Sequence, residues 1–358
     1  MIGRIAVVGV GLIGGSIGLA ARERLGAEVT GFDRSEEALR GGLERRALDR
    51  ACGSLAEALD GAEVAFVAVP VGALPEVVGE VLSLAPRQCV VTDVGSTKRA
   101  VVTAHDDPRF VGGHPLAGAE SSGVEHARAD LFTGATWYLT PTSTTSGMVY
   151  ERLYRLLHSL EARPVAIDPD VHDAILATVS HLPHVLANVL VTQAASALSS
   201  EDERLPATGP SFRDATRVAG ASSLIWTDIY MSNRDALAAV LDQALERLGS
   251  VRDALVRQDA RWIADWNDAA KADRRRLLES QLVGDQLTEL RVSVPNRPGV
   301  VAQLALELGR AGINIADMAL HPAPDMREGV IALWIGGDDE SRRACELIGE
   351  LGYPVVPV

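Results

Sequence analysis

The first 33 residues of this chain constrain its fold more than any other stretch. A short β-branched run, Ile5–Val8, leads into the glycine-rich turn GVGLIG (9–14), and a helical pattern follows through Leu25. A second apolar run, Val29–Phe32, ends at Asp33, 19 residues beyond the third glycine. This spacing between a strand and a helix, with an acid after the next strand, is the fingerprint of a dinucleotide-binding β–α–β unit.

Each part of this fingerprint has a physical role. Gly9 allows the tight turn, Gly11 lets the pyrophosphate approach the backbone, and Gly14 lets helix and strand pack closely. The helix N-terminus then faces the phosphates. Asp33 would accept hydrogen bonds from ribose hydroxyls and repel a 2′-phosphate, which favours NAD over NADP, although Arg34 offers a cation to that phosphate. The expected cofactor contacts are Gly9, Gly11, Leu12, Ile13, Gly14, Asp33, Arg34 and Val69.

Strand–helix alternation continues along the chain, with further strands expected at Glu63–Val69, Gln88–Asp93, Phe110–Gly112 and Thr136–Leu139. Such alternation predicts an α/β fold with a parallel, doubly wound sheet, whose ligands bind beyond the carboxyl ends of the strands. The loops 93–98 (DVGSTK) and 112–123 (GGHPLAGAESSG) follow such ends and should lie over the nicotinamide half of the cofactor. The second loop carries His114 on what we expect to be irregular, glycine-rich backbone.

The overall composition limits the classes of partner. The 358-residue chain has a formal net charge of −14, which argues against nucleic acid and anionic membranes as partners. Its three cysteines are widely spaced and form no metal-ligand pattern, which favours a reduced, cytoplasmic compartment and no metal site. The N-terminus shows no signal-peptide pattern, and we expect no apolar run that approaches the ~18 residues needed to span a bilayer.

The pattern changes from about Pro164 onward. Long helical stretches are expected at 170–199, 213–233 and 234–279. The first contains SHLPH (180–184), whose proline should kink the helix beside two histidines. The second begins with Asp214 and Arg217, three residues apart and therefore on one helix face.

The last segment, residues 287–358, shows another composition. It reads as strand, helix, strand, strand, helix, strand. Two short stretches stand out within it: PNRPGVVAQL (295–304) after the first strand and GINI (312–315) at the start of the second.

Together these motifs resemble the prephenate dehydrogenase family over nearly the whole chain, with a last segment similar to an ACT domain. The residues that carry the resemblance are GVGLIGGS (9–16), DVGSTK (93–98), GGHPLAGAESSG (112–123), SHLPH (180–184), DATRVA (214–219) with Trp226, PNRPGVVAQL and GINI. The resemblance implies NAD-dependent oxidative decarboxylation of prephenate in tyrosine biosynthesis.

The resemblance also implies roles for single residues. His114 would be catalytic and Ser96 would hydrogen-bond it, while Glu120 would gate the pocket. Substrate binding would fall to His181, His184 and Arg217, with Asp214 as a partner and Trp226 as a pocket wall. In the ACT-like segment, Asn296, Gly299 and Asn314 would bind an aromatic amino acid effector, with tyrosine as the first candidate.

The implied chemistry explains the residue types. Hydride leaves C4 of the cyclohexadienol as the 4-hydroxyl loses a proton, and a neutral imidazole is suited to take that proton. Loss of the ring carboxylate as CO2 then gives an aromatic product. Because prephenate carries two carboxylates, an acidic protein must hold it with specific groups, such as the planar fork of Arg217 and a hydrogen bond from His184.

Several alternatives stay open at this stage. His114 and His181 are each open to a structural role, and the last segment to a purely dimerising one. Arogenate differs from prephenate only in a side-chain amine, so an arogenate dehydrogenase is the main rival. A lysine-dependent dehydrogenase of similar architecture would need Lys271, which lies in a polar tail pattern. A non-catalytic sensor is the rival from another class. We expect the remaining histidines to be ordinary surface residues: His105, His126, His158, His172 and His321.

The predicted organisation has three parts. Residues 1–165 would form the NAD-binding domain, 166–284 an all-helical substrate and dimerisation domain, and 285–358 an α+β (βαββαβ) regulatory domain. A homodimer is expected, because helical second domains and ACT modules both pair.

Overall fold

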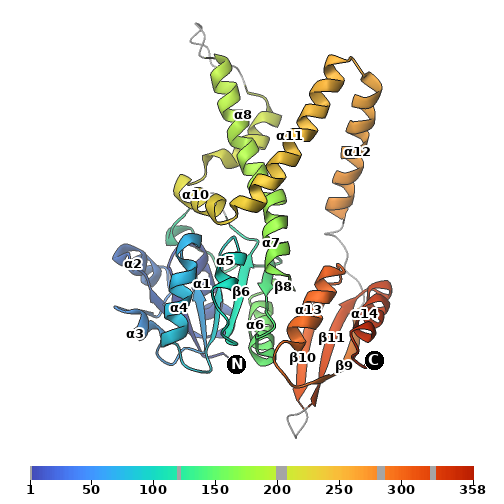
Figure 1. Cartoon of the computed structure of the whole chain (residues 1–358). Helices are drawn as coiled ribbons and strands as arrows, with labels where there is room; N and C mark the ends of the chain where they lie inside the picture. Colours follow the sequence, from blue (N-terminus) through green and yellow to red (C-terminus); the bar gives the residue numbers. More distant parts are fainter. Residues whose placement is uncertain (1, 119–121, 199–207, 280–286, 323–327) are drawn as a thin grey trace.

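The computed structural model describes residues 2–118, 122–198, 208–279, 287–322 and 328–358. Its N-terminal part is an eight-stranded sheet in the order β3-β2-β1-β4-β5-β6-β7-β8 (Figure 1). Neighbouring strands pair in parallel except β6 and β7, which are antiparallel. The strands are β1 (Arg4–Val8), β2 (Glu28–Phe32), β3 (Arg50–Ala51), β4 (Val64–Val67), β5 (Val90–Asp93), β6 (Phe110–Pro115), β7 (Thr136–Thr140) and β8 (Arg163–Ala166).

Helices cover both faces of this sheet. They are α1 (Leu12–Leu25), α2 (Glu36–Glu44), α3 (Leu55–Leu59), α4 (Leu74–Leu84), α5 (Arg99–Thr103) and α6 (Gly147–Ser159). All four residues of β4 are buried, as expected for a central parallel strand covered on both sides. The predicted doubly wound arrangement is therefore present, and the turns that follow β1, β4 and β5 lie at one edge of the sheet.

The glycines of the first turn have the close contacts that the fingerprint requires. Gly9 has a φ of +95°, and a Cβ on it would lie 2.4 Å from the carbonyl oxygen of Ala68. A Cβ on Gly14 would lie 2.0 Å from the carbonyl oxygen of Gly9, so only glycine lets α1 pack on this turn. In contrast, no atom lies within 4 Å of a Cβ built on Gly11, which leaves the front of the turn open.

The middle of the chain is helical, and the first of the three expected helices is continuous. A helix that begins as α7 (Pro169–Leu176) continues through a π-helical turn (Ala177–His181) into α8 (Leu182–Leu198). The helices expected at 213–233 and 234–279 are each divided in two. The first becomes α9 (Pro210–Thr216), a 3₁₀ turn (Arg217–Gly220) and α10 (Ser223–Ser232); the second becomes α11 (Arg234–Val256) and α12 (Ala260–Glu279).

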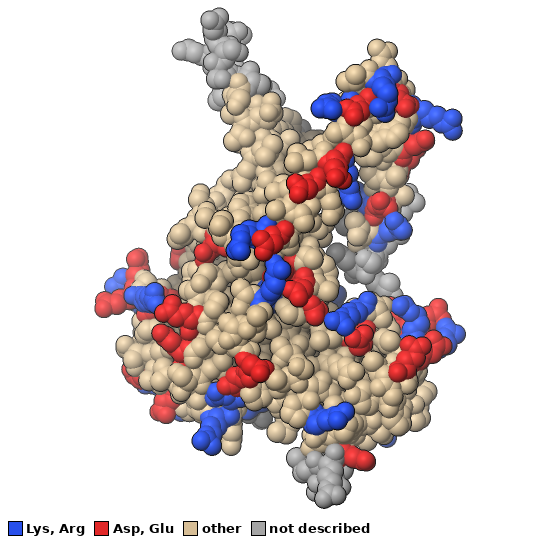
Figure 2. All heavy atoms as spheres, viewed as in Figure 1, with Lys and Arg blue, Asp and Glu red and all other residues tan. Residues whose placement is uncertain are grey.

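The helices α8, α11 and α12 extend away from the sheet (Figure 1). By length and composition alone, the stretch Pro169–Ser196 is the candidate membrane span among the described residues, although its apolar run is interrupted by polar side chains. Two of these, His172 and Asp173, are buried against the N-terminal part. The α8 segment carries no charged side chain, and the face shown in Figure 2 has an uncharged surface there.

The C-terminal part has the predicted element order: β9 (Leu287–Pro295), α13 (Val300–Arg310), β10 (Ile315–Pro322), β11 (Glu328–Gly336), α14 (Asp338–Glu350) and β12 (Val355–Pro357). Its strands form an antiparallel sheet in the order β10-β11-β9-β12. This sheet shares a hydrophobic core with α6. The Tyr154 hydroxyl donates to the Ile315 carbonyl at 2.7 Å, and the Gly299 N–H donates to the Thr145 carbonyl at 3.1 Å, so the two parts are in direct contact.

Candidate active site

His114 lies on strand β6, opposite Tyr138 of β7, and not on an irregular loop as expected from its glycine-rich context. The two preceding glycines are needed because the strand is tightly enclosed. A Cβ on Gly112 would lie 2.4 Å from the hydroxyl oxygen of Thr140, and one on Gly113 would lie 2.6 Å from the carbonyl oxygen of Asp93. The glycines therefore permit strand pairing, and the imidazole projects from a regular, rigid element.

The hydrogen-bond partner of His114 is a second histidine. His114 Nδ1 lies 2.9 Å from Nε2 of His172, and His172 Nδ1 lies 2.8 Å from Oδ1 of Asp173. His172 has no exposed surface, so its expected place on the surface is wrong. A surface position is confirmed for His126 and His158, which are exposed. His105 is half-buried, with its ring nitrogen against the Pro75 carbonyl, and the His321 side chain lies outside the described residues.

Asp173 is fixed by the turn that follows β5. Its Oδ1 accepts a hydrogen bond from the Lys98 N–H at 2.8 Å, and its Oδ2 accepts one from the Arg99 N–H at 3.0 Å. Burial alone would raise the pKa of Asp173, but the hydrogen bonds from His172 and from these two N–H groups lower it. The carboxylate is therefore the stable form at neutral pH.

Lys98 forms a fully buried ion pair with Asp93 beneath the site. Asp93 also accepts hydrogen bonds from the N–H groups of Gly95 at 2.8 Å and Gly113 at 3.2 Å. The pair thus joins the 93–98 turn to the strand that carries His114. Sequence reasoning gave Lys98 no role, because its partner could be assigned only after folding. Ser96 lies half-buried in the same turn, and His114 Nδ1 bonds His172 rather than Ser96.

His114 is 8% exposed, and burial lowers its pKa well below the ordinary value, with further lowering from His172, Lys98 and His181. The imidazole is therefore neutral at neutral pH and can accept a proton. This is the protonation state that a general base requires.

The histidines of SHLPH lie against α10. The His184 ring stacks on Trp226 with centroids 3.6 Å apart and an interplanar angle of 10°, and its Nδ1 contacts the Tyr230 hydroxyl. His181 meets Trp226 edge-on at 6.1 Å, and its Nδ1 lies 3.2 Å from Nδ2 of Asn233. Burial lowers the pKa of His181 to about 4 and also lowers the pKa of His184. The sequence analysis assigned His181, His184 and Trp226 to this site but gave Tyr230 and Asn233 no role.

Other predicted substrate residues are less closely assembled. Asp214 and Arg217 are exposed, on α9 and on the 3₁₀ turn after it, and that turn packs against α8. Glu120 lies outside the described residues.

The predicted cofactor residues lie in the segments that follow β1, β2 and β4. Gly11 caps α1, whose first turn, with Leu12 and Ile13, contains no acidic side chain. Asp33 accepts hydrogen bonds from the N–H groups of Val10 at 2.7 Å and Ser35 at 2.8 Å. A cavity of about 830 Å³ beside Asp33 is also lined by Arg40 and Arg45, which sequence reasoning missed. Arg34 is exposed and Val69 is half-buried after β4.

The fold and the site are those of an NAD-dependent oxidoreductase. The sheet is doubly wound, its first glycine turn is open at Gly11, and a buried neutral imidazole lies on strand β6. The family description "Prephenate dehydrogenase, nucleotide-binding domain" matches residues 17–166, and "Prephenate dehydrogenase, dimerization domain" matches residues 168–266. The prephenate dehydrogenase of Bacillus subtilis is 32% identical over 354 residues, which cover 96% of this chain and 95% of that protein. The chain belongs to the prephenate dehydrogenase family.

Solved structures agree with this assignment. Prephenate dehydrogenase from Aquifex aeolicus, in complex with hydroxyphenyl propionate and NAD+, has a TM-score of 0.73 and 26% identity, covering 77% of this chain and 99% of that one. Synechocystis arogenate dehydrogenase has a TM-score of 0.66 and 27% identity, covering 76% and 99%. The lysine-dependent alternative has no support, since Lys271 is exposed on α12.

Proposed function

We propose that this protein catalyses the NAD-dependent oxidative decarboxylation of prephenate to 4-hydroxyphenylpyruvate in tyrosine biosynthesis. The observation that carries the proposal is the buried, neutral His114 at the carboxyl edge of a dinucleotide-binding sheet. Gly9, Gly11, Gly14 and Asp33 would hold NAD, which would supply the acceptor for the hydride of the substrate C4. His114 takes the proton of the 4-hydroxyl, and Ser96, in the turn beside it, helps to orient the reacting groups.

Substrate recognition is proposed for the helical part. His184, held by Trp226 and Tyr230, offers a rigid hydrogen-bonding group, and His181 lies beside it. Arg217 supplies the cation for a carboxylate, with Asp214 as its partner. Glu120 is the proposed gate. These assignments account for how a chain of net charge −14 can hold a dianion.

A direct assay tests the proposal. Reduced-cofactor formation is measured with prephenate and with arogenate, each with NAD and with NADP. Rapid NAD reduction with prephenate, lost in His114→Ala while NAD binding persists, is the expected result. Activity with arogenate alone would change the substrate and leave the role of His114 in place. Tight NAD binding without turnover of either compound would contradict the proposal and favour the sensor alternative.

We also propose a cytoplasmic homodimer whose interface lies on the helical domain, with domain limits 1–165, 166–284 and 285–358. Large apolar side chains on α8 and α10 are exposed in the single chain: Leu186, Val189, Leu190, Val191, Leu224, Ile225 and Met231. Leu224 is 80% exposed. Contact of its apolar surface with water is unfavourable, and a second copy packed against it would remove that contact. Light scattering of the wild type and of Leu224→Glu tests this: a dimer in the first and a monomer in the second are expected.

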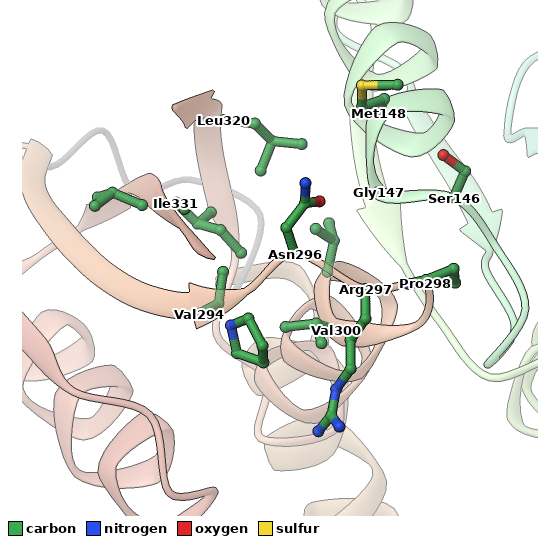
Figure 3. Close-up of a pocket in the computed structure, with 14 residues that line it drawn as sticks. Ser146, Gly147, Met148, Val294, Asn296, Arg297, Pro298, Val300, Leu320 and Ile331 are labelled. Carbon is green, nitrogen blue, oxygen red and sulfur yellow. The ribbon is translucent and has the colours of Figure 1, made fainter. Parts of the chain in front are cut away.

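For the C-terminal part we propose an ACT domain that binds an aromatic amino acid, with tyrosine as the first candidate. A cavity lies between α6 and the turn that joins β9 to α13, and its apolar walls include Met148, Leu320 and Ile331. Figure 3 shows the Asn296 amide directed into the space between Leu320 and Met148, while Arg297 points away. An aromatic side chain would suit these walls and its polar groups would suit the amide.

The structure separates the three predicted effector residues. Asn296 lines the cavity between α6 and the β9–α13 turn, whereas Gly299 and Asn314 line different cavities. A Cβ on Gly299 would lie 2.4 Å from the Ser143 carbonyl oxygen, so this glycine serves the contact between the two parts. Asn296→Ala should therefore weaken the effect of tyrosine on the initial rate at least tenfold, and Asn314→Ala should not. Equal effects of both variants would contradict this location.

A further inference from the structure

We infer that His172 and Asp173 are positioning residues of this reaction, which determine the nitrogen of His114 that takes the substrate proton and stabilise the charge that then forms. The inference rests on the proposed function, because it assigns His114 as the base. It concerns residues that the motifs of the sequence did not identify.

The contacts of Asp173 fix its protonation state. The carboxylate accepts hydrogen bonds from the N–H groups of Lys98 and Arg99 and is ionised, so it can only accept. His172 Nδ1, 2.8 Å away, must therefore carry the proton of that contact. In a neutral imidazole the other nitrogen has no proton, so His172 Nε2 can only accept.

The same count then fixes His114. Its Nδ1 lies 2.9 Å from the accepting His172 Nε2, so it must be the donor. The free lone pair of His114 is consequently on Nε2. The opposite tautomer would place two nitrogen lone pairs against each other at 2.9 Å, and this is unfavourable in a buried site.

The chain of hydrogen bonds also stabilises the product of proton transfer. When Nε2 of His114 takes the proton of the 4-hydroxyl, Nδ1 keeps its own proton and becomes a charged donor to His172, with Asp173 behind it. Lys98 is a cation paired with Asp93, and His181 is neutral, so neither supplies the negative charge that would stabilise a protonated His114. Asp173 is thus the anion that is connected to His114 by hydrogen bonds.

His172 and Asp173 belong to α7, whereas His114 belongs to the sheet. Asp173 also anchors α7 to the 93–98 turn, and its backbone carbonyl accepts a hydrogen bond from Asn233 at 2.7 Å. The aim of the base therefore depends on how the helical part rests on the sheet. A histidine that served only to fill space would not need this order of donors and acceptors.

The test compares three variants of the full-length protein. His172→Phe keeps a planar aromatic side chain but has no ring nitrogen. Its kcat should fall about a hundredfold, the lower range of general-base contributions, with KM and NAD affinity within about twofold. His172→Gln can accept from His114 and donate to Asp173, and should recover at least tenfold of that loss. His105→Phe is the matched control, and its kcat should stay within about twofold.

A spectroscopic readout separates this inference from the proposed function. In histidine-labelled protein, ¹⁵N–¹H correlation spectra report which imidazole nitrogen carries the proton, and the His114 signals are assigned by their loss in His114→Gln. We expect protonated Nδ1 and bare Nε2 in the wild type, and a mixture in His172→Phe. Protonated Nε2 in the wild type, or unchanged kcat in His172→Phe, would overturn the inference even if prephenate is turned over. Absence of turnover with the expected tautomer would instead count against the proposed function.

Discussion

The buried ion pair of Lys98 and Asp93 allows the structure of the site to be tested through stability. Neither side chain is exposed, and the pair connects the 93–98 turn to the strand that carries His114. Burial lowers the pKa of Lys98, and the adjacent Asp93 carboxylate opposes this shift. The two N–H groups that also reach Asp93, from Gly95 and Gly113, are neutral donors and do not replace the charge of the ammonium group.

Replacement of Lys98 by Met should therefore be costly. Methionine fills much of the same volume but leaves a buried carboxylate without its counter-charge, a change that costs about 3–5 kcal/mol. Because Asp93 keeps its two backbone donors, we expect the lower end of this range, about 3 kcal/mol. In the double variant Asp93→Asn/Lys98→Met both charges are gone, and about half of the loss should return.

Equilibrium unfolding in urea, followed by circular dichroism and tryptophan fluorescence, measures these free energies. Lys271→Met is the matched control: this lysine is exposed on α12, and its loss should change the free energy of unfolding by no more than about 0.5 kcal/mol. A loss below about 1 kcal/mol for Lys98→Met would refute the reasoning, as would a double variant that is as unstable as the single one.

Further predictions address catalysis, pH dependence and cofactor preference. In His114→Ala, kcat should fall by about 10²–10⁴ with NAD affinity retained. In the wild type, the pH at which kcat/KM falls on the acid side should lie below 6.5, because the lowered pKa of His114 keeps the base neutral down to lower pH. The pKa of His181 is lowered to about 4 in the folded protein, so the unfolded chain binds more protons than the folded one between about pH 4 and 6.5. The free energy of unfolding should therefore decrease as pH falls through this window, and the decrease should be smaller in His181→Gln. In Asp33→Ser, the ratio of kcat/KM for NADP to that for NAD should rise about tenfold or more, since the repelling carboxylate is gone.

The N-terminal fold could be predicted because its signal is local. The spacing of Gly9, Gly11 and Gly14 reflects backbone contacts within one β–α–β unit, and the structure shows those contacts. The order of elements in the last segment could also be predicted from the sequence. The division of the helices expected at 213–233 and 234–279 could not. Gln258 adopts a φ of +56° between α11 and α12 with no glycine or proline at that position, so tertiary packing sets the turn.

The active site was predictable only for residues within motifs. His172 follows Asp168 and Pro169 at the start of a helix, where polar side chains usually face solvent, and its partner His114 is 58 residues away. One signal was available: Asp173, His181 and His184 recur at helical spacing and indicate a polar face directed inward. Lys98 lies with Asp93 in the DVGSTK motif, but a spacing of five residues does not indicate that the two side chains form a buried ion pair.

The contacts between the two larger parts suggest why the site takes residues from both. Asp173 binds the 93–98 turn, Thr97 and Ser232 share a hydrogen bond of 2.8 Å, and Asp228 accepts a hydrogen bond from the Gly72 N–H at 2.9 Å. All three join the carboxyl edge of the sheet, where a dinucleotide is expected to bind, to helices that hold the proposed substrate residues. A displacement of α7 would remove the partner of His114 and move His181 and His184 together. Base orientation and substrate position are therefore set by one packed interface, and substitutions of Thr97 or Asp228, whose side chains join α10 to the sheet, should change kcat and KM jointly.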